Sequence, residues 1–256
     1  MRRKLIYLLM LAISLGFSNQ ARGQARVEVA ILQVEAIFGE QINIEAEATS
    51  ETPIKNVEVF LQQETENPNS VGEVTFNPPN QILYTLDLRA NPIDVFSQIS
   101  YWFQIELENG DLITSEHFYF DYTDNRFEWQ SLSTGEFEIF WYEGDDDFGR
   151  QVINTAYDGL AGIGEYLHVP QSEKIRFYIY ASTVEMQDTL AINNQVLNQI
   201  AGHANSDLGV ITVSIPPGPS QTLEIKRQIP HELSHVLLYQ RLGEGYANLP
   251  KWLNEG

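Results

Sequence analysis

Short runs in which apolar and polar residues alternate fill the chain from Val27 to about Tyr122. The clearest of these runs are 42–48, 57–61, 84–88, 101–107 and 117–120. Alternation with a period of two is typical of strands that bury one face, and the turn residues between the runs, Asn109-Gly110 above all, predict antiparallel hairpins. We therefore expect an immunoglobulin-like β-sandwich over residues 24–125.

The pattern changes after Asn125 to a mixture of strands and longer helical segments. Strands are expected at 137–142, 174–180 and 209–215, and helices at about 145–167, after Ser182-Thr183, at about 222–242 and from Pro250 onward. Prolines at 216, 217 and 219 end the third of these strands. Mixed elements of this kind predict an α+β domain, which we place at residues 126–256.

The first 23 residues form a pattern of their own. Basic residues at positions 2–4 precede an apolar run from Leu5 to Leu15, and Ala21-Arg22-Gly23 follows as a small-x-small cleavage pattern. This arrangement is typical of an export signal. The apolar run is short for a bilayer core of roughly 30 Å, and no later segment approaches a span. We expect an exported protein, extracellular, periplasmic or at the cell surface, without a stable membrane span.

Composition narrows the partners and the chemistry. The formal net charge is −20, and removing residues 1–23 would remove four basic residues and no acidic one. A surface this acidic repels nucleic acid and anionic lipid. The absence of cysteine excludes disulfides and thiolate metal sites, which leaves His, Asp and Glu as metal ligands. An exported chain without disulfides favours a bacterial source.

One short motif carries recognisable chemistry. His231-Glu232-Leu233-Ser234-His235 matches the pattern H-E-x-x-H. On a helix its two histidines lie one turn apart on the same face, so both imidazoles can reach one metal ion. Glu232 lies near that face without being forced to ligate, which suits a general base that takes a proton from water.

A catalytic zinc site needs a third protein ligand and one open position. The extended motif H-E-x-x-H-x-x-G-x-x-H is excluded, because Leu238 and Arg241 stand where its glycine and third histidine would be. The candidates that remain downstream are Glu244, in a Gly-Glu-Gly loop, and Glu255, on the helix expected from Pro250. We favour Glu255, because two antiparallel helices joined by a short loop would return it to the histidines, and we keep Glu244 as the alternative.

The motif and the later segment Leu253-Asn254-Glu255-Gly256 together resemble the gluzincin zinc metallopeptidases, and the surrounding residues are similar to bacterial proteins with a peptidase MA-like domain. The resemblance implies a Zn²⁺ ion held by His231, His235 and Glu255, with Glu232 as general base and then general acid. It further implies that Tyr246 stabilises the oxyanion and that the strand at 209–215 is the edge strand that pairs with an extended peptide. The alternative for Tyr246 is a tyrosine packed in a surface loop.

Family members continue the ligand-bearing helix, with a further carboxylate one turn later. This chain stops at Gly256. We therefore expect an incomplete gene product, which as given would be weakly active or inactive.

Taken together, the patterns predict an exported zinc metalloendopeptidase that acts on a peptide or protein substrate. One alternative is a cell-surface adhesion or binding module whose zinc helix is degenerate or structural. Another is a hydrolase that uses the same metal site on other esters or amides. We expect His203 in an exposed loop, with a place in the cleft just before the edge strand as the alternative, and Trp102, Trp129 and Trp141 in the core.

Overall fold

The computed structural model describes residues 26–63, 72–167, 174–192 and 201–254, so the export signal predicted at 1–23 lies outside the described residues. The strands are β1 Val27–Ile37, β2 Gln41–Ser50, β3 Ile54–Gln63, β4 Glu73–Asn77, β5 Gln81–Asp87, β6 Ser97–Leu107, β7 Leu112–Thr114, β8 Phe118–Tyr122, β9 Gln130–Ser133, β10 Phe137–Trp141, β11 Ile175–Tyr180, β12 Gly202–Asn205 and β13 Val210–Ser214. The helices are α1 Asp146–Leu167, α2 Thr183–Ile192, α3 Gln221–Leu242, the 3₁₀ helix η1 Gly243–Asn248 and α4 Lys251–Asn254.

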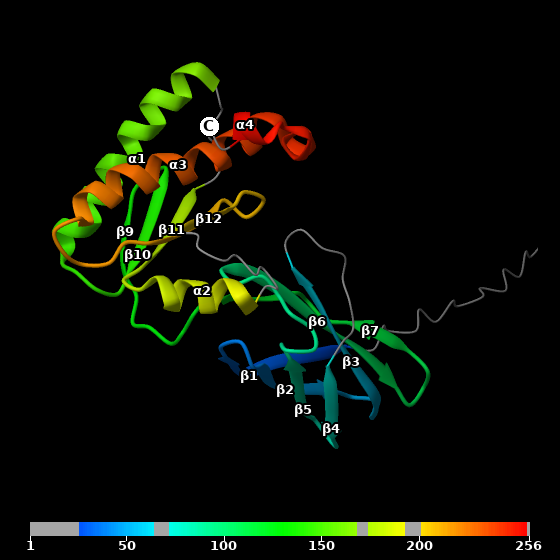
Figure 1. Ribbon diagram of the computed structural model, residues 1–256. Coiled ribbons are helices and arrows are strands. Elements are labelled where there is room, and N and C mark those ends of the chain that lie inside the picture. The colour runs from blue at the N-terminus through cyan, green and yellow to red at the C-terminus, as the bar shows by residue number, and fades with distance from the viewer. Residues whose placement is uncertain (1–25, 64–71, 168–173, 193–200, 255–256) are drawn as a thin grey trace, which may run out of the picture.

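The N-terminal part consists of two antiparallel sheets (Figure 1). One has the order β1-β2-β5-β4, and in the other β6 pairs with β3 on one side and with β7 and β8 on the other. Every second residue of β6 is buried, and the buried faces of both sheets form one hydrophobic cluster. The hairpin predicted at Asn109-Gly110 is confirmed, because β6 and β7 pair on either side of it and Gly110 has φ +86°.

The C-terminal part is a five-stranded sheet of order β12-β13-β11-β10-β9. Its three central strands β10, β11 and β13 run parallel, and β9 and β12 pair antiparallel at the two edges. Helices α1 and α3 cover one face, while α2 lies on the other face, toward the N-terminal sheets (Figure 1). All five residues of β13 are buried, as expected of a central strand covered on both faces.

One sequence prediction about this sheet is wrong. The strand at 209–215 was expected at the edge, but β13 lies between β12 and β11. The edge strand is β12, whose residues Gly-His-Ala-Asn include no β-branched or aromatic side chain and so gave no strand pattern.

The two parts share a core across the boundary predicted near residue 125. Tyr178 and Tyr180 of β11, with Met186 and Leu190 of α2, belong to the same buried cluster as the N-terminal sheets. The ring of Phe96 stacks on that of Tyr178 with centroids 3.5 Å apart. The core of the N-terminal sheets therefore continues onto the face of the C-terminal sheet that carries α2.

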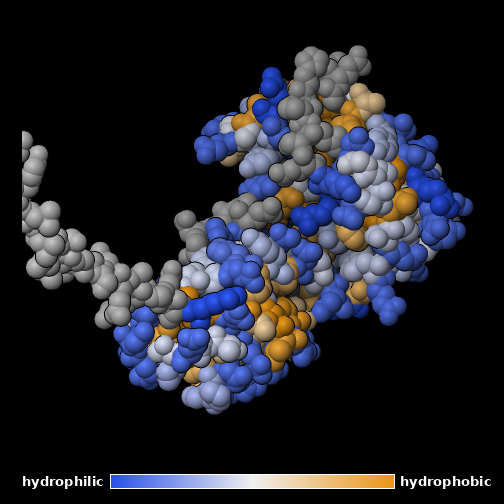
Figure 2. Space-filling model, turned by 180° about the vertical axis from the view of Figure 1, so that it is seen from behind, coloured by the Kyte–Doolittle hydropathy of each residue, from blue (hydrophilic) through white to orange (hydrophobic). Residues whose placement is uncertain are grey.

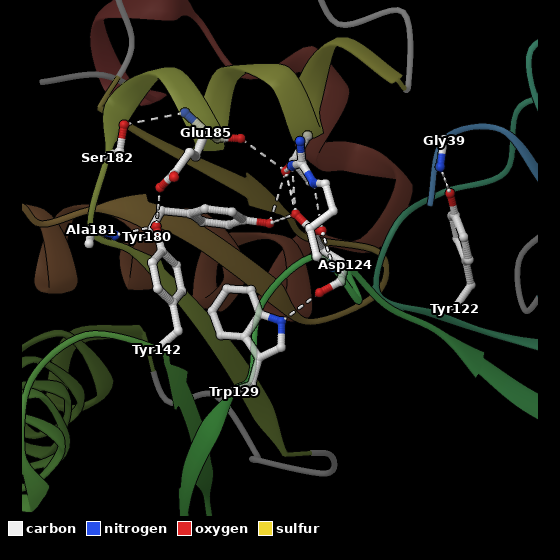
Figure 3. A network of polar contacts seen from close by, with 11 residues as sticks. Gly39, Tyr122, Asp124, Trp129, Tyr142, Tyr180, Ala181, Ser182 and Glu185 are labelled. Atoms are coloured by element: carbon white, nitrogen blue, oxygen red, sulfur yellow. Dashed lines mark hydrogen bonds and ion pairs between the residues drawn. The ribbon is translucent and has the colours of Figure 1, made fainter. Parts of the chain in front are cut away.

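A buried polar knot is centred on Asp124 (Figure 3). The carboxylate of Asp124, with 0% of its residue surface exposed, accepts hydrogen bonds from Arg126 Nε (2.9 Å), Arg126 Nη2 (2.8 Å), the Tyr180 hydroxyl (2.8 Å) and the Thr189 hydroxyl (2.8 Å). Trp129 Nε1 donates to the Asp124 carbonyl at 2.7 Å. Burial, and after it the charge of Asp124, raises the pKa of Tyr180, so its hydroxyl remains a donor. The knot fastens β11 and α2 to the segment that leaves the N-terminal sheets.

A second tyrosine extends this contact. The Tyr142 hydroxyl hydrogen-bonds the carboxylate of Glu185 at the start of α2, and the backbone N–H of Ala181 donates to the same hydroxyl at 2.8 Å (Figure 3).

Hydrophilic residues cover most of the molecular face seen in Figure 2. Over the described ranges, no helix combines the length and the apolar character that crossing a bilayer requires.

Candidate active site

The H-E-x-x-H motif lies on helix α3. This segment forms a helix packed on the core because its apolar residues recur with helical spacing. Ile225, Ile229, Leu233, Val236 and Leu237 are all buried against the sheet and α1. Gln228 adds a polar anchor, since its Nε2 donates to the carbonyl of Ser214 in β13 at 3.0 Å. The helix is thereby fixed with the motif beside the sheet edge.

The two histidines of the motif lie together, as predicted. The ring centroids of His231 and His235 are 4.9 Å apart, with an angle of 85° between the ring planes. His231 is exposed, whereas only 8% of His235 is accessible. The pair thus has one solvent-facing and one buried imidazole.

The carboxylate between them packs against the edge strand. Glu232 is 7% exposed. A Cβ atom placed on Gly202 of β12 would lie 2.4 Å from Glu232 Oε1, which is closer than real contacts allow. Only glycine at position 202 leaves room for the carboxylate in this position.

The orientation of His235 is set by residues that follow α3. Its Nδ1 lies 3.2 Å from Asn254 Oδ1 and 3.3 Å from the Tyr246 hydroxyl. If Nδ1 carries the proton and donates to Asn254, Nε2 presents its lone pair as a metal ligand. The 3₁₀ helix η1 and helix α4 therefore return the chain to His235.

The structure leaves the third ligand unassigned. Glu255 directly follows Asn254 but lies outside the described residues. Across the part of the chain that the structure describes, no three His, Cys, Asp or Glu side chains gather as a metal-binding group. Glu244 is exposed in η1 and does not line the pocket at the histidines.

These residues open onto a pocket of about 490 Å³. Its lining comes from β12 and the residue before it, from α3, and from the segment after α3: Ala201, Gly202, His203, Ala204, Arg227, Gln228, His231, Glu232, His235, Tyr246 and Asn254. The volume lies in the range of small-molecule and cofactor sites. Four of the predicted metal-binding and catalytic residues lie in described segments, and all four line the pocket: His231, Glu232, His235 and Tyr246.

The exposed loop expected for His203 is wrong, and the alternative, a place in the cleft, holds. Instead of occupying an exposed loop, it lies in β12 opposite Thr212 and lines the pocket. Burial, and secondarily the nearby His235, lowers the pKa of His203. A neutral imidazole at neutral pH follows, available as a hydrogen-bonding group in the pocket wall.

Comparison with protein families adds an independent finding. The family model described as Peptidase MA superfamily matches residues 155–256, the segment that holds α3 and the pocket. The match supports a peptidase-MA-like domain in the C-terminal part of the chain. No curated protein matches the sequence.

Several solved structures resemble parts of the chain. A β-1,3-glucan-binding domain of carbohydrate-binding module family 56 is 15% identical, with a TM-score of 0.25, over 36% of this chain and 98% of its own. OgpA from Akkermansia muciniphila is 17% identical, with a TM-score of 0.29, over 40% of this chain and 30% of its own. The chitinase ChiW from a Paenibacillus species is 10% identical, with a TM-score of 0.32, over 91% of this chain and 17% of its own.

Proposed function

We propose that the C-terminal part of the chain is a zinc-dependent peptidase in which Glu232 is the general base. The observation that carries the proposal is the joint presence, in one pocket of about 490 Å³, of two imidazoles one helical turn apart, a buried carboxylate and the edge strand of a sheet. The match of residues 155–256 to the Peptidase MA superfamily supports the same reaction class. Export, inferred from the pattern of residues 1–23, remains part of the proposal.

His231 and His235 would hold the zinc ion, with Glu255 as the third ligand. The donor set suits zinc, since the ion accepts imidazole nitrogen and carboxylate oxygen, and a proton donated from Nδ1 of His235 to Asn254 would leave Nε2 for the ion. When bound, zinc supplies Lewis acidity that activates a water near neutral pH and polarises a carbonyl group.

Glu232 moves the protons of the reaction. As general base it takes a proton from the attacking water, and as general acid it delivers that proton to the leaving nitrogen of the scissile peptide bond. Its carboxylate lies where a Cβ atom at position 202 would come within 2.4 Å of Oε1, so the glycine keeps this place open. This matters for catalysis, because small displacements of a reacting group are costly.

The peptide substrate would bind along β12. Among the described strands, β12 pairs with β13 alone, and its other side lies at the edge of the sheet beside the histidines. An extended peptide can add to such an edge by main-chain hydrogen bonds. Tyr246 lines the same pocket, and we propose that its hydroxyl stabilises the oxyanion that forms at the scissile carbonyl.

The decisive test of the reaction is the isosteric substitution Glu232→Gln. Protein expressed from the complete gene and loaded with zinc should cleave members of a peptide library, detected by mass spectrometry, and its Glu232→Gln variant should retain zinc while losing at least about 10²-fold in kcat/KM. Glu244→Gln, an exposed carboxylate outside the pocket, is the matched control and should cleave at the wild-type rate. Full activity of Glu232→Gln would remove the general-base assignment.

A further inference from the structure

The second candidate site lies on the N-terminal part, on the outward face of the sheet built on β6. Residues paired across this sheet share a face, so two successive rows cross it. The first row comprises Phe60 of β3, Trp102 of β6 and His117 beside β8; Phe60 and Trp102 are register partners. Their rings form a continuous stack, with centroids 5.7 Å and 4.3 Å apart. Trp102, expected in the core, therefore lies on the outer face.

The second row is Gln62, Ser100 and Tyr119, again direct register partners across β3, β6 and β8. Ser100 is the smallest side chain of the face and is surrounded by larger ones. A hollow of about 210 Å³ results, lined by these three residues with Gln63 and Gln98. Tyr119 is 61% exposed at its rim.

The hollow is neutral in a strongly acidic chain. Among the described residues, its lining consists of amide, hydroxyl and phenol groups, with no lysine or arginine. A third row of the sheet, on the other side of the hollow from the aromatic row, pairs Gln98 of β6 with Asp121 of β8. Gln98 Nε2 donates to Asp121 Oδ1 at 3.3 Å. Asp121 disfavours anionic ligands, and a single carboxylate is too small a donor set for a metal ion.

The chemistry of the lining selects a neutral, polyhydroxylated ligand. Amides and hydroxyls both donate and accept hydrogen bonds, so they can pair with the hydroxyl groups of a sugar. The exposed ring of Tyr119 supplies an apolar surface with a polar tip, which suits a ligand that has both C–H and O–H faces. The aromatic row beside the hollow continues that surface along the sheet.

We infer that this hollow binds a neutral saccharide and that the N-terminal part attaches the protein to a glycan. The site is defined by Gln62, Gln98, Ser100 and Tyr119. It makes no use of α3 or the histidine pocket, so it goes beyond the proposed peptidase activity and does not depend on it.

The test is retardation of the full chain in native affinity gels that contain neutral glucans, mannans or galactans. Wild-type protein should be retarded by at least one of these polysaccharides. Tyr119→Ala and Ser100→Gln, which remove the ring and fill the hollow, should weaken retardation at least about tenfold. Tyr119→Phe keeps the ring and should retain most of the binding.

Two controls separate this site from the rest of the molecule. Leu112→Ala removes an exposed side chain from β7 of the same sheet, and it should bind like wild type. Glu232→Gln should also bind like wild type, so a failed peptidase assay leaves this result intact. Absence of retardation by every polysaccharide, or wild-type retardation of both Tyr119→Ala and Ser100→Gln, would overturn the inference.

Discussion

Two buried carboxylates, Asp124 and Glu232, show how differently the molecule uses the same chemical group. Asp124 has 0% exposure and accepts hydrogen bonds from Arg126, Tyr180 and Thr189. Glu232 has 7% exposure, but it lies against a glycine and opens onto a pocket with two imidazoles. The first carboxylate is enclosed by donors and joins two parts of the fold, whereas the second faces a space that a ligand can enter.

The difference shows how a carboxylate that stabilises the fold can be distinguished from one that can take part in a reaction. A buried charge that is fully paired costs several kcal/mol to disrupt and serves the fold. A buried carboxylate beside a cavity keeps lone pairs in reach of a substrate or water. Substitutions at the first should change stability, and substitutions near the second should change turnover with little effect on stability.

The largest effect is expected at the knot. Asp124→Ala removes the acceptor of several buried donors, so the free energy of unfolding should fall by about 3 kcal/mol. Asp147→Ala is the matched control, because Asp147 also pairs with an arginine, Arg150, but its side chain is 84% exposed. Denaturant unfolding should show a shifted midpoint for the first variant and none for the second. Equal midpoints would show that the knot does not hold the two parts together.

Gly202→Ala should have the next largest effect, on turnover. The added methyl group would meet Glu232 Oε1 at 2.4 Å and displace the carboxylate. We expect kcat to fall about 10²-fold while bound zinc is retained. Gly162→Ala in α1 is the control, since nothing lies within 4 Å of its added Cβ. Steady-state peptide cleavage and metal analysis of both variants decide the matter; unchanged kcat in Gly202→Ala would contradict the close-packing argument.

A smaller effect is expected at Asn254, which contacts Nδ1 of His235. Asn254→Ala removes the group that orients the imidazole, and zinc affinity should fall about tenfold. Competition with a chromogenic chelator measures this affinity. Asn248→Ala, an exposed asparagine in η1, should leave it unchanged. A wild-type affinity for Asn254→Ala would mean that the contact does not orient the ligand.

Much of the fold could be predicted from periodicity and turn chemistry. The alternation in β6, the hairpin at Asn109-Gly110 and the helical spacing in α3 each have one strong physical reading, and each is confirmed. The edge strand β12 could not be predicted, because it is four residues long and holds no β-forming side chain. Its place depends on pairing with β13, which is a tertiary interaction.

The residues of the candidate site also fall into two groups, those that the sequence indicates and those that only the fold brings to the pocket. The histidine pair and Glu232 follow from local spacing on one helix, so the sequence alone indicates them. Gly202, His203 and Gln228 reach the pocket through the arrangement of β12 and α3, and the residues around His203 fit an exposed loop as well as the cleft. The single usable signal was the glycine before His203, since a glycine in a strand often marks close approach of another group.

The account depends most directly on the two imidazoles binding one divalent ion. Zinc content per protein chain, measured after loading and desalting of the wild type, His235→Ala and the exposed-histidine control His117→Ala, tests this claim. We predict close to one zinc per chain for the wild type and His117→Ala, and almost none for His235→Ala. Equal zinc in all three proteins, or no zinc in the wild type, would contradict the proposed site.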